Sequence, residues 1–339
     1  MNERRSNIEL LRCFAMLCII VYHLLMYVVL PAHPGESIYQ ALQIPLHIGV
    51  PLFVLISGYF GIRFSLRGLM RLFSKSYIYI VPLTLIPSII GGSSIKDVLK
   101  HLFPFGFYAL WYLNVYLYLF LLSPIINRYI EGITKKQRVY LLLVLMFISV
   151  YIGNVTQGDP HLSDGKNIIN FLLLYMIGNT IRQEQSRINS ILGRKMFILY
   201  ILFNIALVLV FMYIPILAGK IWKYSFAYNS PIIIINSVWA FAMFTKLRFS
   251  SKFVNWMGGS IFACYLLQSV CWHNCFEVPV QKLNVIFVNP FVAVILMILF
   301  GAISMLFMVC IDKCLNPLWN RLIAFAVKYD DKWKINQLR

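Results

Sequence analysis

Long apolar runs alternate along the chain with short segments that contain most of the charged residues. Runs such as 139–151 and 196–217 are almost continuously apolar, whereas the strands of an outer-membrane barrel would alternate apolar and polar side chains. A membrane-spanning helix needs about 20 apolar residues. The pattern therefore predicts an all-α, polytopic membrane protein with ten spans. Their approximate ranges are 7–30, 44–62, 76–92, 109–127, 138–153, 168–181, 196–215, 229–246, 257–273 and 288–311.

The positions of Lys and Arg predict how these spans are oriented. With the N-terminus in the cytoplasm, the cytoplasmic segments hold 23 of the 30 Lys and Arg residues, the outer loops hold six and the first span holds Arg12. Cytoplasmic loops of membrane proteins carry such an excess of basic residues. The sequence thus predicts that both termini are cytoplasmic. It also predicts a transmembrane domain over 1–315 and a basic tail over 316–339 that is attracted to anionic lipid.

Composition supports a membrane protein and excludes several other classes. The chain is 60% hydrophobic and 12% charged, against about 45–50% and about 25% in soluble domains. A net charge of +18 would suggest nucleic-acid binding in a soluble protein. Because these basic residues lie in short loops beside the membrane, we expect no nucleic-acid partner. The seven cysteines and the histidines show no metal-ligand spacing, so we expect no bound metal.

The first predicted span carries three ionisable residues, Glu9, Arg12 and His23. Such residues cost at least about 2.5–3.5 kcal/mol inside a membrane and commonly mark function. The separation between Arg12 and His23 corresponds, on a helix, to about 20° beyond three full turns and about 16.5 Å of rise. Both side chains are therefore predicted to lie on one face, with Glu9 one turn before Arg12 and able to pair with it.

Two interpretations of Arg12 and His23 stay open at this point. In the structural one, Arg12 extends to lipid phosphates and His23 forms a hydrogen bond between helices. In the functional one, a cation near the membrane surface and a titratable group deeper on the same face bind an anionic cosubstrate whose reactive end reaches inward. His23 would then act as a general base.

Small residues and then basic residues mark the end of the second predicted span. Ser57 and Gly58 permit close approach of another backbone. Arg67, Arg71 and Lys75 follow at intervals of four residues, so a continuing helix would place them along one face. These charges are either the ordinary basic residues of a cytoplasmic loop or a phosphate clamp.

Together these residues resemble the acyltransferase-3 family of bacterial membrane O-acyltransferases. The first helix of that family carries an Arg, ten intervening residues and a His, which Arg12 and His23 match here. The signature of the family's second span is similar to Val50–Tyr59, and a Leu-Trp-aromatic-Leu element is similar to Leu110–Leu113. The first two motifs together are specific, and the agreement in span number extends over the whole chain.

The resemblance implies an O-acyltransferase of the bacterial inner membrane, with acetyl as the expected group. Such an enzyme would move the acyl group from cytoplasmic acetyl-CoA, or another short acyl-CoA, to a hydroxyl of a cell-surface polysaccharide or lipid-linked saccharide. The acyl-CoA would be a cosubstrate, with no tightly bound cofactor. The residues implied in binding it are Arg12, Ser57, Gly58, Tyr59, Arg67 and Arg71.

The resemblance also implies catalytic roles for His23 and Arg12. His23 would either deprotonate the acceptor hydroxyl or carry the acyl group transiently. Glu36, in the first outer loop, would assist His23 if the acceptor enters from outside. The residues expected to contact the acceptor are His47, Trp111, Tyr112 and Gln268, although Trp and Tyr are also typical of the membrane interface.

Two departures from the family pattern keep other functions open. Gln268 stands where many relatives have His, and Asn114 stands where many have a basic residue. A transporter or flippase for an envelope saccharide or lipid-linked precursor would use Arg12 and His23 as a coupling site. An inactive scaffold or sensor is the other alternative, and acyl-CoA binding without turnover would favour it.

Overall fold

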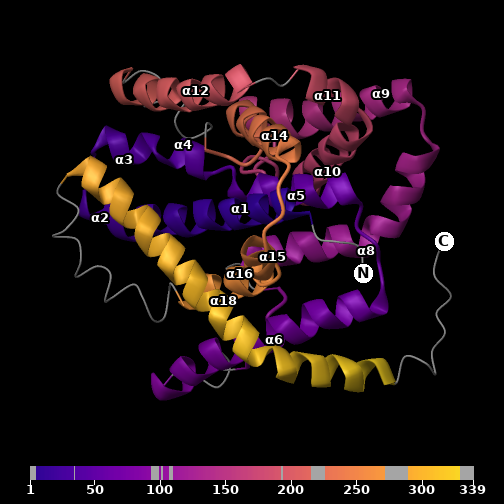
Figure 1. Cartoon of the computed structure of the whole chain (residues 1–339), viewed down its shortest axis with the longest axis vertical. Coiled ribbons are helices and arrows are strands. Elements are labelled where there is room, and N and C mark those ends of the chain that lie inside the picture. Colours follow the sequence, from indigo (N-terminus) through magenta and orange to yellow (C-terminus); the bar gives the residue numbers. More distant parts are fainter. Residues whose placement is uncertain are drawn as a thin grey trace.

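The computed structural model describes residues 5–33, 35–92, 99–100, 102–106, 110–191, 194–214, 226–271 and 289–328. Within these ranges every regular element is a helix, which confirms the predicted all-α class. The helices surround α1 (Ser6–Leu24), which lies in the middle of the molecule (Figure 1). The helices that pack against α1 include α5 (Gly49–Phe60), α14 (Pro231–Lys246), α15 (Lys252–Gly258), α16 (Ile261–Cys271) and α18 (Pro290–Lys328).

The central helix changes its geometry close to its end. α1 continues without a break into the π-helical segment η1 (Leu25–Val29) and then into α2 (Leu30–Ala32). The side chains of Leu11 and Ile20 are fully buried, because α1 is enclosed by other helices. π-Helical turns inside α-helices are frequent at functional sites, and η1 begins two residues after His23.

The second predicted span is divided into pieces that end in a tightly packed helix. It consists of α4 (Gln43–Leu46) and α5, and α3 (Ser37–Ala41) directly precedes it. α5 packs against α10 (Ile168–Gln183) so closely that a Cβ on Gly58 would lie 2.0 Å from the Tyr175 carbonyl oxygen. The close backbone approach expected at Gly58 is therefore present.

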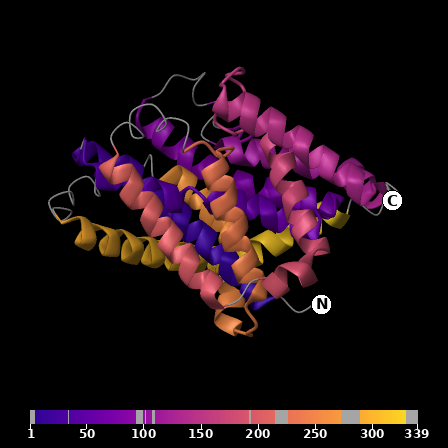
Figure 2. The same ribbon diagram turned by 90° about the horizontal axis from the view of Figure 1, so that it is seen from above.

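The remaining helices cover this centre on two sides. α12 (Arg194–Tyr213) lies along one edge, and α18 crosses α16, α1 and α6 (Leu66–Ile90) on the other side (Figure 1). Seen from above, α12, α14 and α1 run alongside one another (Figure 2). The other elements are α8 (Trp111–Gly132), α9 (Lys135–Met146), the π-helical η3 (Phe147–Val155) and α11 (Gln185–Ile191).

Several helices have the length and composition of membrane spans. In the described part of the chain, the helical stretches long and apolar enough to cross a membrane are Ser6–Ala32, Ser37–Phe60, Leu66–Ile90, Trp111–Gly132, Lys135–Val155, Lys195–Tyr213 and Pro290–Leu318. The shorter helices α10, α14 and α16 lie at three other predicted spans. These are the helices of a multi-pass membrane protein, while the number of ten spans and the cytoplasmic position of the termini stay predictions. The boundary placed near residue 315 falls inside the continuous helix α18.

Candidate active site

A cavity of about 680 Å³ lies between α1, α5, α6, α8 and α16. Arg12 and His23 both line it, so the single face predicted for them on α1 is confirmed. The cavity also receives the cationic side chains of Arg71, Lys75 and Lys166, and none of its described lining residues is Asp or Glu. This charge distribution suits an anionic ligand. The predicted site residues that line the cavity are Arg12, His23, His47, Ser57, Arg71, Trp111, Tyr112 and Gln268.

His23 contacts a residue that is remote in the sequence. It occupies the last turn of α1, and its Nδ1 is hydrogen-bonded to the side-chain amide of Gln268 on α16. Gln268 is buried, and its Oε1 has no hydrogen-bond partner in the structure as described. Because a 180° turn of the amide exchanges its donor and acceptor, Gln268 can either donate to Nδ1 or accept from Nδ1–H. Gln268 is therefore placed to orient the His23 ring, in addition to the acceptor contact expected from the sequence.

Arg12 is held by the neighbouring carboxylate. Its Nη1 lies 2.7 Å from Glu9 Oε1, so the predicted pair is present. Glu9 packs against the end of α15, where a Cβ on Gly258 would lie 2.1 Å from Glu9 Oε2. The Arg12 side chain remains 34% exposed and lines the cavity. Glu9 thus fixes the guanidinium while leaving it accessible.

The basic residues of α6 separate into two groups. Arg71 and Lys75 line the cavity, whereas Arg67 is exposed and does not. Lys75 Nζ lies 2.9 Å from Asp312 Oδ1 on α18, and the Tyr79 hydroxyl donates to the same oxygen at 2.8 Å. Only part of the predicted phosphate clamp, Arg71 and Lys75, therefore reaches the cavity. Asp312, which is buried and positions Lys75, was not found from the sequence.

The signature at the end of α5 is divided between the cavity and the protein core. Ser57 lines the cavity, and its hydroxyl donates to the Phe53 carbonyl oxygen at 2.9 Å. Gly58 faces Tyr175 of α10, and the Tyr59 ring packs 5.5 Å from the Phe241 ring, measured between centroids. Gly58 and Tyr59 pack against neighbouring helices and do not line the cavity, and their expected contact with acyl-CoA stays a prediction.

An aromatic wall, formed by His47, Trp111 and Tyr228, lines the cavity. The Tyr228 ring centroid lies 4.3 Å from that of His47 and 5.1 Å from that of Trp111. Tyr228 precedes α14, and burial raises the pKa of its hydroxyl well above the ordinary value, so the group stays protonated. His47 Nδ1 is buried without a hydrogen-bond partner in the described structure and is available to a ligand. Tyr112 adjoins the wall, with its ring centroid 6.1 Å from that of Trp111.

Glu36 lies away from His23. Its Oε1 is 3.0 Å from Nδ1 of His33, and its side chain is 44% exposed. Glu36 is not among the residues that line the cavity. The structure therefore does not bring Glu36 to His23 as the sequence suggested, because the chain after α2 directs it toward His33 instead.

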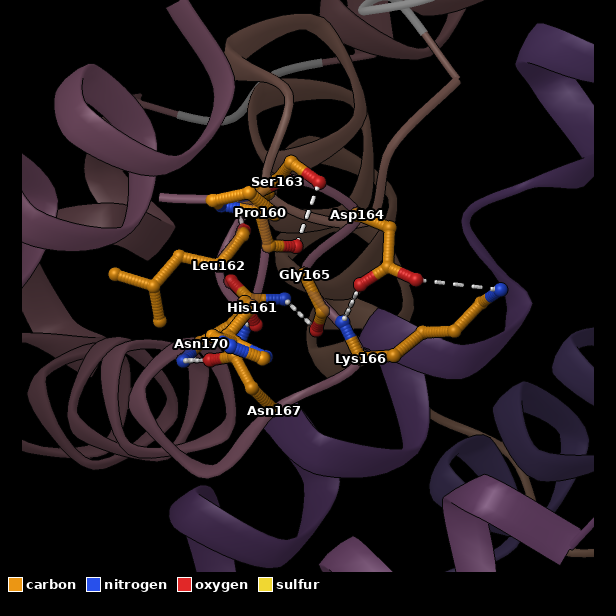
Figure 3. A network of polar contacts seen from close by, with 10 residues as sticks. Pro160, His161, Leu162, Ser163, Asp164, Gly165, Lys166, Asn167 and Asn170 are labelled. Carbon is orange, nitrogen blue, oxygen red and sulfur yellow. Dashed lines mark hydrogen bonds and ion pairs between the residues drawn. The ribbon is translucent and has the colours of Figure 1, made fainter. Parts of the chain in front are cut away.

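Lys166 reaches the cavity from the loop before α10, and the sequence assigns it only to an outer loop. Its Nζ lies 5.8 Å from the centre of the Trp111 ring. Figure 3 shows its ion pair with Asp164, in which Nζ lies 3.4 Å from Asp164 Oδ2. The Asp164-Gly165 pair before it is a typical turn sequence and is a local signal of an ordered loop. No local signal shows that the loop ends at Trp111, since that contact depends on how the helices pack.

The fold and the cavity together define a multi-pass membrane protein with a buried site rich in cations. Residues 5–313 match the family model described as an acyltransferase domain, and the chain belongs to the acyltransferase-3 family. Comparison with curated proteins and with solved structures gives no match. The family establishes a membrane acyltransferase, and the geometry described above supplies the basis for its chemistry.

Proposed function

We propose that the chain is a membrane O-acyltransferase that transfers an acyl group, with acetyl as the expected group, from cytoplasmic acyl-CoA to a hydroxyl of an envelope saccharide. The observation that carries this proposal is the shared cavity of Arg12 and His23, with further cations on α6 and an aromatic wall beside His47. A donor and an acceptor can then reach one histidine from different parts of the same cavity.

The donor is assigned to the part of the cavity that Arg12, Arg71 and Lys75 line. Guanidinium groups bind phosphate through two parallel hydrogen bonds, and an ammonium group adds a point charge. The rise from Arg12 to His23 is about 16.5 Å along α1, a distance that the long pantetheine arm of CoA bridges when it is extended. Phosphates at Arg12 therefore place the thioester toward His23.

In the direct route, His23 acts as a general base. The acceptor hydroxyl oxygen attacks the thioester carbon while its proton passes to Nε2 of His23. The C–S bond then breaks, and the CoA thiolate takes that proton from His23, so the products are the ester and CoA with a free thiol. In the covalent route Nε2 attacks the thioester carbon, the C–S bond breaks and CoA leaves as the thiolate. The acceptor hydroxyl oxygen then attacks the acyl carbon, the C–N bond breaks to restore neutral His23, and the hydroxyl proton passes to the thiolate, so the products are again the ester and CoA with a free thiol.

Both routes require Nε2 of His23 to be free of a proton at the start. In a neutral imidazole the proton then lies on Nδ1 and needs an acceptor. Gln268 supplies that acceptor when its Oε1 faces Nδ1, an orientation reached by turning the amide. Gln268 is accordingly a positioning residue for His23 in this proposal.

The test is acyl transfer from radiolabelled acetyl-CoA in inside-out membrane vesicles that contain the natural acceptors. We expect label in a saccharide or lipid fraction with the wild type and with His33→Ala, and loss of label with His23→Ala and Arg12→Ala. His33 is the matched control because it is a histidine that does not line the cavity. Equal labelling by all four proteins would remove His23 and Arg12 from the reaction. If the wild type neither transfers label nor binds acetyl-CoA, the transporter alternative replaces the proposal.

A further inference from the structure

Lys166 stands apart from the other cations of the cavity. Arg12 lies in the first half of α1, and Arg71 and Lys75 lie on α6, whereas Lys166 contacts Trp111 of the aromatic wall. Since acyl-CoA phosphates are assigned to the first three, the positive charge of Lys166 is not used by the donor. A separate anionic group can therefore be accommodated at this part of the cavity.

The loop that carries Lys166 is fixed by hydrogen bonds (Figure 3). Asp164 Oδ1 accepts from the Lys166 backbone N–H at 2.9 Å, and Asn170 Nδ2 donates to the Gly165 carbonyl oxygen at 3.0 Å. Gly165 adopts a φ of +71°, and a Cβ there would lie 2.6 Å from the Asn229 backbone nitrogen. The backbone around Lys166 is thus held against the segment before α14 and presents the side chain in a defined place.

The charge of Lys166 is only weakly committed to Asp164. Their side-chain atoms lie 3.4 Å apart, and the side chains are 32% and 49% exposed. Ion pairs this accessible to solvent contribute little to stability because water screens them. A ligand anion that enters the cavity can therefore compete with Asp164 for the ammonium group.

The groups next to Lys166 suit a sugar ring. Trp111 and Tyr228 offer aromatic faces on which the apolar face of a sugar can pack. His47 Nδ1 is buried in the cavity wall without a hydrogen-bond partner in the described structure, and a sugar hydroxyl can donate to it. A cation, two aromatic faces and a polar atom that lacks a partner thus line the same cavity.

We propose that Lys166 and the aromatic wall form a subsite for an anionic saccharide, with Lys166 bound to a carboxylate or phosphate of the acceptor. This inference rests on the proposed function, which supplies the acceptor, and it specifies the class of that acceptor. The negative charge of Asp164 repels an anionic ligand and so lowers the affinity of that ligand for Lys166. Neutral saccharides lack the group that Lys166 recognises and bind more weakly.

Three probes test the proposal on the purified full-length protein in detergent. Methyl β-glucoside is the neutral probe, methyl β-glucuronide carries a carboxylate, and the 6-phosphate of methyl β-glucoside carries a phosphate. Their Kd values are measured by ligand-observed NMR. We expect at least one charged probe to bind about tenfold more tightly than the neutral probe, as for a charge-assisted hydrogen bond. The two charged probes distinguish a carboxylate acceptor from a phosphate acceptor.

The variants separate the charge from the fold. Lys166→Gln should reduce the preference for the charged probe over the neutral probe to about twofold or less, and Lys166→Arg should keep this preference. Asp164→Asn should increase it, because the amide oxygen still accepts from the Lys166 N–H while the negative charge is gone. Lys100→Gln is the matched control, since Lys100 does not line the cavity.

Equal Kd values for the charged and neutral probes, or no binding of any of them, would overturn the subsite. So would a preference that Lys166→Gln leaves unchanged. Acetyl-CoA titration of the same samples tests the donor site independently. If acetyl-CoA binds and no saccharide preference is found, the subsite alone fails. If the preference depends on Lys166 but acetyl-CoA does not bind, the acyl-transfer proposal fails and the saccharide site stands.

Discussion

The contact between Gln268 and His23 leads to the sharpest prediction about catalysis. Replacement by leucine, Gln268→Leu, removes the amide that faces His23 Nδ1 and puts an apolar side chain of similar size in a buried position. Removing the partner of a buried polar group costs about 1–3 kcal/mol. If that cost falls on the productive orientation of the ring, kcat decreases about 5- to 150-fold, since about 1.4 kcal/mol is a factor of ten. The KM for acetyl-CoA should change less than about twofold, because the donor phosphates are assigned to Arg12 and α6.

A second substitution at this position reports which atom of Gln268 faces the ring. Gln268→Glu keeps an oxygen that accepts from Nδ1–H but removes the amide donor. If His23 reacts through Nε2, we expect Gln268→Glu to retain kcat within about fivefold while Gln268→Leu does not. Initial rates with radiolabelled acetyl-CoA separate kcat from KM. Gln183→Leu, at an exposed position on α10, is the control for an unrelated glutamine.

Two results would refute this reasoning. Full activity of a folded Gln268→Leu protein would show that the amide does not position His23. An equal loss with glutamate and leucine would show that the amide donor is what matters, and His23 would then carry its reactive role through another arrangement of protons. Thermal melting of each purified variant shows whether a change in rate reflects only a loss of fold.

Three further predictions concern packing and placement. Gly58→Ala should lower the free energy of unfolding by about 1–3 kcal/mol, because the new Cβ would meet the backbone of α10. Gly132→Ala is the control: its Cβ would have nothing within 4 Å, so the Tm should stay unchanged or increase. Equal Tm values for the two variants would contradict this prediction. Asp312→Asn should lower the Tm and weaken acetyl-CoA binding in a titration, since the charged acceptor of two hydrogen bonds from α6 is lost, and wild-type affinity would exclude a role in holding Lys75. Glu36→Gln should leave the transfer rate within about twofold of wild type, because Glu36 lies outside the cavity; a larger decrease in the vesicle assay would restore its role beside His23.

The hydrophobic pattern predicts where helices lie but not where they are interrupted. The predicted span at 44–62 consists of α4 and α5 with His47 between them, and this interruption contributes to the placement of His47 in the cavity wall. An average over about 20 residues is the same for one long helix and for two short ones. The π-helical segment after His23 escapes prediction for the same reason, since it changes hydrogen bonding without changing hydropathy.

Candidate residues were predicted best where a single helix determines the geometry. Arg12 and His23 share a face because of helical periodicity alone, and Glu9 meets Arg12 for the same reason. The contact between Gln268 and His23 joins residues 245 positions apart and depends on which helices become neighbours. Apolar helix surfaces are similar to one another, so neither hydropathy nor spacing determines that choice. The contact of Lys166 with Trp111 likewise depends on which helices become neighbours.

Arg67 and Arg71 are two residues that the sequence treats alike and that the packing of the helices separates, and this difference can be tested. They have the same charge and lie one turn apart on α6, and the sequence assigns both to the same phosphate clamp. In the structure only Arg71 of these two residues lines the cavity, whereas the Arg67 side chain is exposed outside it. We therefore expect Arg71→Ala to raise the KM for acetyl-CoA about tenfold, as for a lost charge-assisted contact, and Arg67→Ala to leave it within about twofold. Saturation curves for the two purified variants measure this difference directly. Equal increases would mean that the donor phosphates lie outside the cavity, along the exposed face that both residues share.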